Sequence, residues 1–194
     1  HISQPVLLNS DLEKLKHLQD QGFEYAVIQC VFKADGRPGR LEESLNRICA
    51  EAEKAVRAGK RILILSDRKI SDDYAPIPSL ISVGTIHHFL VEKRIRTSAG
   101  LVVEAGDVWE VHHFATIIGY GASAVNPYMA LETIHFMNKQ GMFNKNQTDD
   151  EAYANYQKAI GSGLLKVMSK MGISTLQSYQ SAQILEAIGL GSDV

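Results

Sequence analysis

The chain is poor in the residues and patterns that mark several protein classes. Its 194 residues include two cysteines, Cys30 and Cys49, which stand in apolar surroundings and form no C-x-x-C pair. Two such residues are too few for an iron–sulfur cluster or a disulfide framework. We therefore expect them to be small core residues of a cytoplasmic protein.

The sequence also lacks a long apolar run and an excess of positive charge. No stretch approaches the ~18–20 apolar residues of a membrane helix, and residues 1–5 (HISQP) do not read as the start of a signal peptide. Lys and Arg total 20 against 22 Asp and Glu, so the formal net charge is −2. Nucleic acids are bound by clustered positive charge, so we expect neither a nucleic-acid nor a membrane partner.

What the sequence does have is an alternation of strand-like and helix-like segments, with hydrophobic residues making up 45% of the chain. Compact aliphatic runs predict buried strands at 25–32, 61–66, 101–104 and 122–126. Apolar residues at helical spacing predict helices at 41–56, 77–93 and 108–118, and Pro127 suits the first turn of another. Ser10 is a candidate N-cap for a short helix that Gly22 closes. A polar linker at about 144–150 precedes predicted helices at 150–171 and 176–188.

Continuous apolar strands that alternate with helices predict a parallel sheet covered on both faces. Four or five strands are too few to close an eight-stranded barrel. We therefore predict an α/β fold, a partial (βα) barrel-like parallel sheet of about four to five strands flanked by helices. The length suits a single domain over residues 1–194.

Polar residues follow the predicted strands, at the edge where parallel α/β folds gather function. Asp67 and Arg68 leave the second strand together, Glu104 ends the third, and Asn126 ends the fourth. One interpretation is structural, with Asp67 capping the next segment and Arg68 in an ion pair. The other is a functional site, because structural ion pairs and site residues share this appearance.

His112 and His113 raise the question of a metal site. Adjacent histidines on a helix point about 100° apart, so they do not chelate as a pair, and the i, i+4 spacing of HExxH is missing. Glu104, Glu110 and His113 could still converge in space. We predict no metal, with one histidine packed against the core and the other facing solvent or a carbonyl.

The glycine-containing segments do not match known phosphate-binding loops. Gly119-Tyr120-Gly121 follows a helix and lacks the third glycine of a dinucleotide fingerprint, and residues 161–166 (GSGLLK) are no Walker A loop. A G-x-S-x-G nucleophile elbow is also missing from the sequence. The residues alone therefore nominate no complete catalytic apparatus and no cofactor site.

Several motifs resemble the central domain of the glutamate synthase large subunit, in one order over almost the whole chain. They are LILSDR (63–68), APIPSL (75–80), RTS (96–98), GLVVE (100–104), EVHHFA (110–115), GYGA (119–122), NPY (126–128) and KVMSKMGIST (166–175). The sequence departs from the family at Trp109, where an arginine is expected. It also departs at Gln180-Ser181, where Arg-Gly or Cys-Gly is expected.

The resemblance implies a parent oxidoreductase of glutamate biosynthesis and ammonia assimilation. Such an enzyme couples glutamine hydrolysis to reductive amination of 2-oxoglutarate and yields two glutamates. Its large subunit holds an amidotransferase domain, the central domain, an FMN barrel with a 3Fe-4S cluster, and a β-helix. A small subunit or ferredoxin would supply electrons, in the cytoplasm or, for a plant-type parent, in the plastid stroma.

The resemblance further implies that this chain is the C-terminal part of the central domain. Its partners would then be the amidotransferase and FMN domains of the same polypeptide, and it would help to wall the ammonia tunnel without being catalytic or holding a cofactor itself. Two alternatives stay open. One is a free-standing metal- or phosphate-dependent α/β enzyme that uses Asp67, Arg68, His112 and His113, and the other is a regulatory or protein-binding module.

Overall fold

A computed structural model describes residues 4–18, 22–143, 147–186 and 188 of the chain. In this part of the chain the main sheet has four parallel strands, and their spatial order β1-β3-β5-β6 is also their order along the chain. The strands are β1 (Tyr25–Gln29), β3 (Ile62–Ser66), β5 (Gly100–Glu104) and β6 (Ala124–Asn126). The predicted α/β fold with a partial, barrel-like parallel sheet is confirmed.

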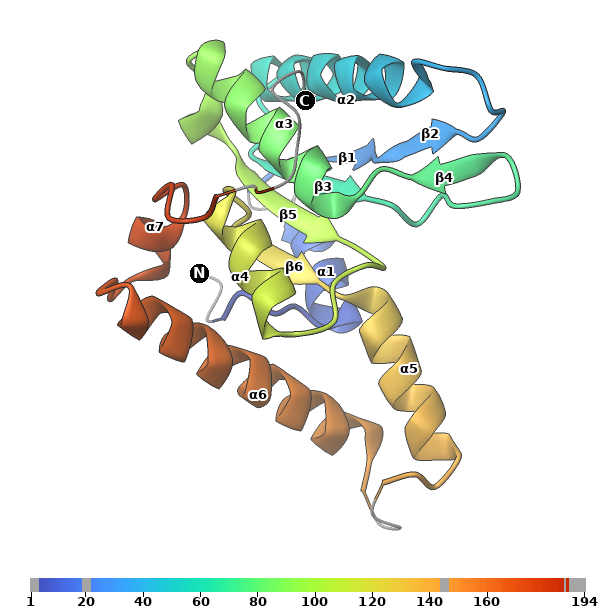
Figure 1. Ribbon diagram of the computed structural model, residues 1–194, viewed down its shortest axis with the longest axis vertical. Coiled ribbons are helices and arrows are strands. Elements are labelled where there is room, and N and C mark those ends of the chain that lie inside the picture. The colour runs from blue at the N-terminus through green and yellow to red at the C-terminus, as the bar shows by residue number, and fades with distance from the viewer. Residues whose placement is uncertain (1–3, 19–21, 144–146, 187, 189–194) are drawn as a thin grey trace.

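Helices connect the successive strands and cover the sheet (Figure 1). Helix α2 (Arg40–Arg57) joins β1 to β3, α3 (Ser79–Glu92) and the short 3₁₀ turn η2 (Arg96–Ser98) join β3 to β5, and α4 (Val111–Gly119) joins β5 to β6. The remaining helices are α1 (Asn9–Lys16), α5 (Tyr128–Lys139), α6 (Asp149–Lys170) and α7 (Leu176–Tyr179). No helix in the described ranges is both long and apolar enough to cross a membrane.

The strand residues alternate between two hydrophobic clusters, as the period of two of a β-strand requires. Leu63, Leu65, Leu101 and Val103 belong to the large core, which includes residues of α2, α3, α4 and α6. The intervening residues, among them Ile64 and Val102, form a smaller cluster with Leu7, Leu12 and Ala124. Helix α1 therefore covers the face of the sheet opposite to the large core.

The predicted strand at 25–32 is wrong in one respect, because it is two strands in two sheets. Residues Val31–Lys33 form β2, which pairs antiparallel with β4 (Tyr74–Pro76). Cys30 is the junction: its amide donates to the Ser66 carbonyl at 2.7 Å, and its carbonyl accepts from the Ile77 amide at 2.9 Å. Both pieces are apolar, so hydrophobicity alone does not reveal where the chain changes partners.

Two predicted helix boundaries also differ from the structure. The helix predicted at 176–188 ends at Tyr179, and positive φ angles at Ser181 (61°) and Gln183 (53°) stop it from continuing. Residue 187 of that prediction lies outside the described residues. The first helix begins at Asn9 and not after Ser10, because the Asp11 carboxylate accepts from the Leu8 amide at 3.2 Å.

The polar linker predicted at about 144–150 lies between α5 and α6, and its residues 144–146 are outside the described part. Thr148 caps α6: its hydroxyl accepts from the Glu151 amide at 3.2 Å, while the Glu151 carboxylate accepts from the Thr148 amide at 2.9 Å. This reciprocal pair begins the 22-residue helix at Asp149, close to the predicted start at 150.

The N-terminal segment lies along the edge of β6. Val6 forms a parallel bridge with Val125, whose amide donates to the Pro5 carbonyl at 2.7 Å. From the other side, the Gln157 side chain on α6 donates to the Val6 carbonyl at 2.9 Å. The segment is thereby fixed to both the sheet and the long helix.

Candidate functional site

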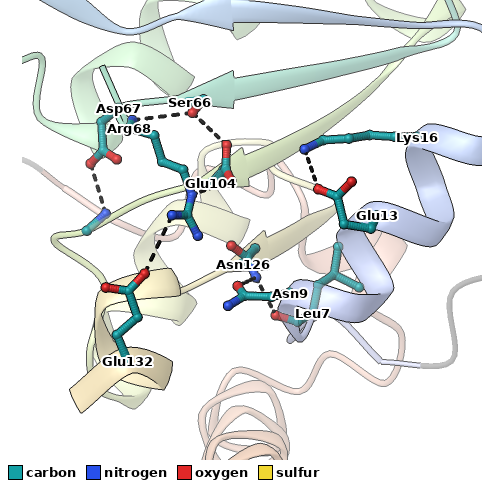
Figure 2. A network of polar contacts seen from close by, with 11 residues as sticks. Leu7, Asn9, Glu13, Lys16, Ser66, Asp67, Arg68, Glu104, Asn126 and Glu132 are labelled. Carbon is teal, nitrogen blue, oxygen red and sulfur yellow. Dashed lines mark hydrogen bonds and ion pairs between the residues drawn. The ribbon is translucent and has the colours of Figure 1, made fainter. Parts of the chain in front are cut away.

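The parallel register places the candidate residues in one row across the sheet. Ser66 is the register partner of Gln29 on one side and Glu104 on the other, and Glu104 is in turn the partner of Asn126. The carboxyl ends of parallel strands form the usual functional edge of such folds. Asp67 and Arg68 extend this row, so four of the six predicted residues lie at one edge (Figure 2).

Glu104 is the centre of the contacts at this edge. Its Oε2 accepts a hydrogen bond from the Ser66 hydroxyl at 2.6 Å, and its Oε1 accepts from Arg68 Nε at 2.7 Å. The carboxylate is buried, at 7% exposure. A buried carboxylate needs this compensation, because an unpaired charge in such a place costs several kcal/mol.

Arg68 has further contacts beyond Glu104. Its guanidinium carbon lies 4.1 Å from the centre of the Tyr128 ring, and Nη1 lies 3.5 Å from a Glu132 oxygen. The predicted structural ion pair of Arg68 is therefore present. It links the end of β3 to both β5 and α5 (Figure 2).

Asp67 is buried and contacts the loop after β5. Its Oδ2 accepts from the Gly106 amide at 2.8 Å, while Oδ1 is buried and has no hydrogen-bond partner in the described part of the chain. Burial raises the pKa of Asp67 above its ordinary range, although the Gly106 amide and the Tyr128 hydroxyl oppose this shift. The sequence suggested that Asp67 caps the segment that follows it. In the structure Asp67 instead holds the loop after β5.

The next residue of that loop, Asp107, contacts helix α3. Its carboxylate accepts from both the amide and the hydroxyl of Ser79, the first residue of the helix. An acidic group at this position satisfies free N–H groups and favours the helix dipole. The loop after β5 is therefore held by β3 through Asp67 and holds α3 through Asp107.

Asn126 connects the sheet to the N-terminal segment. Its Nδ2 donates to the Leu7 carbonyl and to Asn9 Oδ1, both at 3.0 Å, and the residue is fully buried. Its Oδ1 has no hydrogen-bond partner among the residues that the structure describes. The contacts of Asn126 therefore hold the start of α1 against the end of β6.

His112 and His113 lie on α4 and take no part in these contacts. His113 Nδ1 accepts from the Trp109 amide at 3.1 Å, and its Nε2 lies 3.8 Å from Glu110 Oε1, whereas His112 is exposed. Glu104 does not join Glu110 and His113. Among the described residues, no three His, Cys, Asp or Glu side chains are grouped as a metal ion would require.

Ser66 and Gly106 stand at the ends of the predicted strands together with Asp67 and Glu104, whereas Tyr128 and Glu132 were not expected in the network. Tyr128 and Glu132 are four residues apart, so they share one face of α5, and that helix follows directly on β6. Gly106 has a steric role, since a Cβ at this residue would lie 2.9 Å from the Tyr128 hydroxyl. The i, i+4 spacing of Tyr128 and Glu132 just after a predicted strand could have indicated that both face the carboxyl edge.

Two solved structures with the same fold are flavin enzymes. A mandelate oxidase with a monooxide FMN adduct is 14% identical, with a TM-score of 0.52, covering 91% of this chain and 62% of that one. A flavocytochrome b2 mutant with bound pyruvate is 12% identical, with a TM-score of 0.52, covering 94% of this chain and 56% of that one. The fold is thus part of a barrel of this kind, and identities this low show the fold alone.

The chain is therefore a barrel-related α/β domain, and the polar residues at the carboxyl edge of its sheet bind one another. Residues 1–191 match the family model of the glutamate synthase central domain. The chain belongs to this family.

Curated relatives agree with the family assignment. The chain is 45% identical to glutamate synthase [NADH] of Schizosaccharomyces pombe, with 98% of this chain and 9% of the relative covered. It is 43% identical to the glutamate synthase [NADPH] large chain of Bacillus subtilis, covering 98% of this chain and 12% of the relative. It is also 43% identical to ferredoxin-dependent glutamate synthase 1 of Arabidopsis thaliana, over 100% of this chain and 12% of that protein. The chain therefore spans about a tenth of the length of these relatives.

Proposed function

We propose that this chain is a connector domain of a glutamate synthase, placed between an amidotransferase domain and an FMN domain and helping to wall the ammonia tunnel. The family assignment supports the parent enzyme, and the share of about 9–12% of each relative supports a role as one part of a larger polypeptide. The parent would convert glutamine, 2-oxoglutarate and reductant into two glutamates. In this proposal the chain itself performs none of the chemistry.

The observation that carries the proposal is the engagement of the carboxyl-edge side chains with one another. Both oxygens of Glu104 are occupied by Ser66 and Arg68, and Asp67 binds the Gly106 amide. Catalysis by these groups would require them to point at a substrate in a mutually oriented nucleophile–base arrangement. Their contacts instead fix the relative positions of β3, β5 and α5.

The same proposal assigns the cofactors and the electron donor to other parts of the parent. FMN and a 3Fe-4S cluster would belong to the FMN domain of the parent. The relatives are named for NADH, NADPH and ferredoxin, so a small subunit or ferredoxin would deliver the electrons. The compartment would be the cytoplasm, or the plastid stroma for a plant-type parent, since a relative from Arabidopsis is named chloroplastic/mitochondrial and one from rice is named chloroplastic.

The test is to substitute Glu104→Gln in the full-length enzyme. A connector predicts lower thermal stability, or glutamine hydrolysis that no longer matches glutamate formation one to one, while glutaminase and synthase each still turn over. Glu132→Gln is the matched control, because this exposed carboxylate lies 3.5 Å from Arg68 and has the same charge. Loss of one half-reaction by Glu104→Gln at unchanged stability would mean that the residue acts in catalysis.

The alternative of a free-standing metal- or phosphate-dependent enzyme using Asp67, Arg68, His112 and His113 gains no support from the geometry. Asp67 contacts the loop after β5 and Arg68 contacts β5 and α5, while His113 contacts Trp109 and Glu110 within its own segment. Within the described residues, no hydrogen bond or ion pair joins Asp67 or Arg68 to either histidine.

A further inference from the structure

A cavity of about 470 Å³ lies beside α2 and the β2–β4 ribbon, with Gln29, at the end of β1, in its wall. This volume is within the range of small-molecule sites, about 300–1,000 Å³. Lys69, just past the end of β3, is also part of the wall, so the cavity lies at the carboxyl edge of the sheet. This edge is where α/β folds place their ligands.

Four basic side chains line the cavity, and they come from three parts of the chain. Lys33 is on β2, Arg40 and Arg47 are on α2, and Lys69 is in the loop after β3. Glu43 is the one carboxylate in the wall as described. A concave surface with an excess of one charge concentrates ions of the other sign.

The two arginines use their N–H groups within the protein. Arg40 donates from Nε and Nη2 to the Asp35 carboxylate and from Nη1 to Glu43 at 2.7 Å. Arg47 donates from Nη2 to the carbonyls of Gln29 and Val31 and from Nη1 to Glu51. These bonds hold the walls of the cavity in place and leave little donor capacity for a ligand.

The two lysines are in a different situation. Within the described part of the chain, the ammonium groups of Lys33 and Lys69 have no ion-pair partner, unlike Lys14, Lys16 and Lys60. Lys33 is fixed in the antiparallel register opposite Tyr74, which also lines the cavity. An ammonium group offers three rotatable donors and a compact charge, which suits phosphate or carboxylate oxygens.

The Gln29 side chain completes the cavity wall on the sheet side. Its Oε1 is buried and has no hydrogen-bond partner among the described residues, so this oxygen is not open to a ligand in the cavity.

We propose that this cavity binds a small dianion, a phosphate- or dicarboxylate-bearing metabolite, through Lys33 and Lys69. Arg40 and Arg47 shape the cavity, and Gln29 forms its wall on the sheet side. The site depends on residues other than those that carry the connector role. Its failure and the failure of the connector proposal are therefore distinguishable.

The test is lysine labelling on the full-length polypeptide that contains this chain, read residue by residue by mass spectrometry. An amine-acylating reagent is applied with inorganic phosphate, with succinate, or with chloride at equal ionic strength. A bound ammonium is a poor nucleophile, so labelling of Lys33 and Lys69 should fall about tenfold when the site is ~90% occupied. Lys158 and Lys166, both exposed on α6, are the internal controls.

A variant that leaves both lysines intact makes the test sharper. Ser44→Glu places a carboxylate in the cavity wall and should abolish the protection of Lys33 and Lys69. Ser162→Glu, on the exposed side of α6, should leave it unchanged. Protection by phosphate alone or by succinate alone identifies the group that is recognised, and protection by both indicates recognition of charge.

Three outcomes would overturn the proposal. In the first, neither anion protects Lys33 and Lys69. In the second, the control lysines are protected equally, which is ionic screening and not binding. In the third, protection survives Ser44→Glu.

Discussion

Arg68 Nε lies 2.7 Å from Glu104 Oε1, so an ion pair with one buried end joins the loop after β3 to the last residue of β5. Parallel neighbours in a sheet already share backbone hydrogen bonds, and this pair adds a connection just beyond the last of them. The stacking of Arg68 on Tyr128 carries the connection on to α5.

Glu104→Gln should lower the free energy of unfolding of the chain by about 1–3 kcal/mol, because a charge-assisted bond is lost and a buried polar group is left poorly paired. Glu132→Gln should change it by less than about 0.5 kcal/mol, since its exposed contact with Arg68 is long. Urea denaturation of both variants measures the difference. Equal changes in unfolding free energy would show that the buried Arg68–Glu104 pair stabilises the chain no more than the exposed contact does.

Two glycines of α6 should respond to alanine in opposite directions. A Cβ at Gly163 would lie 2.3 Å from Val111 Cγ2, whereas a Cβ at Gly161 meets nothing within 4 Å. Gly163→Ala should therefore cost about 1–3 kcal/mol through overpacking of α6 against α4. Gly161→Ala should stabilise the chain by up to ~1 kcal/mol through helix propensity. Thermal or urea unfolding that gave the two variants the same sign would refute the close contact.

His87 should make stability depend on pH. Arg96 Nε donates to its Nδ1 at 2.9 Å, so the neutral ring carries its proton on Nε2, 3.1 Å from the Ser181 hydroxyl. Burial, with the charge of Arg96, lowers the pKa of His87 to about 4, against ~6.5 when unfolded. The neutral ring thus contributes stability that is complete above pH ~6.5 and is lost as the pH falls towards 4.

His87→Gln should accordingly flatten the decline of unfolding free energy between pH ~6.5 and 4, whatever its effect at pH 7. Urea denaturation at several pH values gives the slope. His112→Gln, at an exposed histidine of α4, is the control and should keep the wild-type slope, whereas His88 contributes to the lowered pKa of His87. An unchanged slope in His87→Gln would show that the ring does not titrate in this interval.

The purified chain should be colourless and bind neither FMN nor an iron–sulfur cluster. Its two cysteines, Cys30 and Cys49, are both buried, and burial raises the pKa of the Cys30 thiol to about 12 and that of Cys49 to about 11. Cluster ligation needs thiolates at suitable spacing. An absorbance spectrum after reconstitution with FMN or with iron and sulfide tests this. Flavin or cluster bands near one equivalent would contradict it.

The sequence was sufficient for the parallel core, because buried strands leave long apolar runs and helices leave a different period. The strand ends also pointed to Asp67, Arg68, Glu104 and Asn126, which the register does bring to one edge. The β2–β4 ribbon was not predictable in this way. Val31–Lys33 and Tyr74–Pro76 are short, and their pairing depends on a change of partner at Cys30.

The sequence indicated which residues lie at the candidate site better than it indicated which residues they contact. Whether Asp67 caps its own segment or binds Gly106 depends on how far the loop after β5 reaches, and this is a tertiary property. The end of α7 is similar, since the positive φ of Ser181 arises at a residue where its family resemblance leads one to expect glycine. Glycine adopts this positive φ without strain. Ser181 adopts it while its hydroxyl is hydrogen-bonded to His87.

The hydrogen bond from Gln157 to the Val6 carbonyl joins residues 151 positions apart in the chain. During synthesis at about 5–20 residues per second, roughly 8–30 s separate the appearance of these two residues. The first segment therefore leaves the ribosome long before the helix that secures it exists. Because such distant contacts must close before they stabilise anything, the domain is expected to complete its fold only after α6 has been made, and until then the N-terminal segment is held without the bond from Gln157.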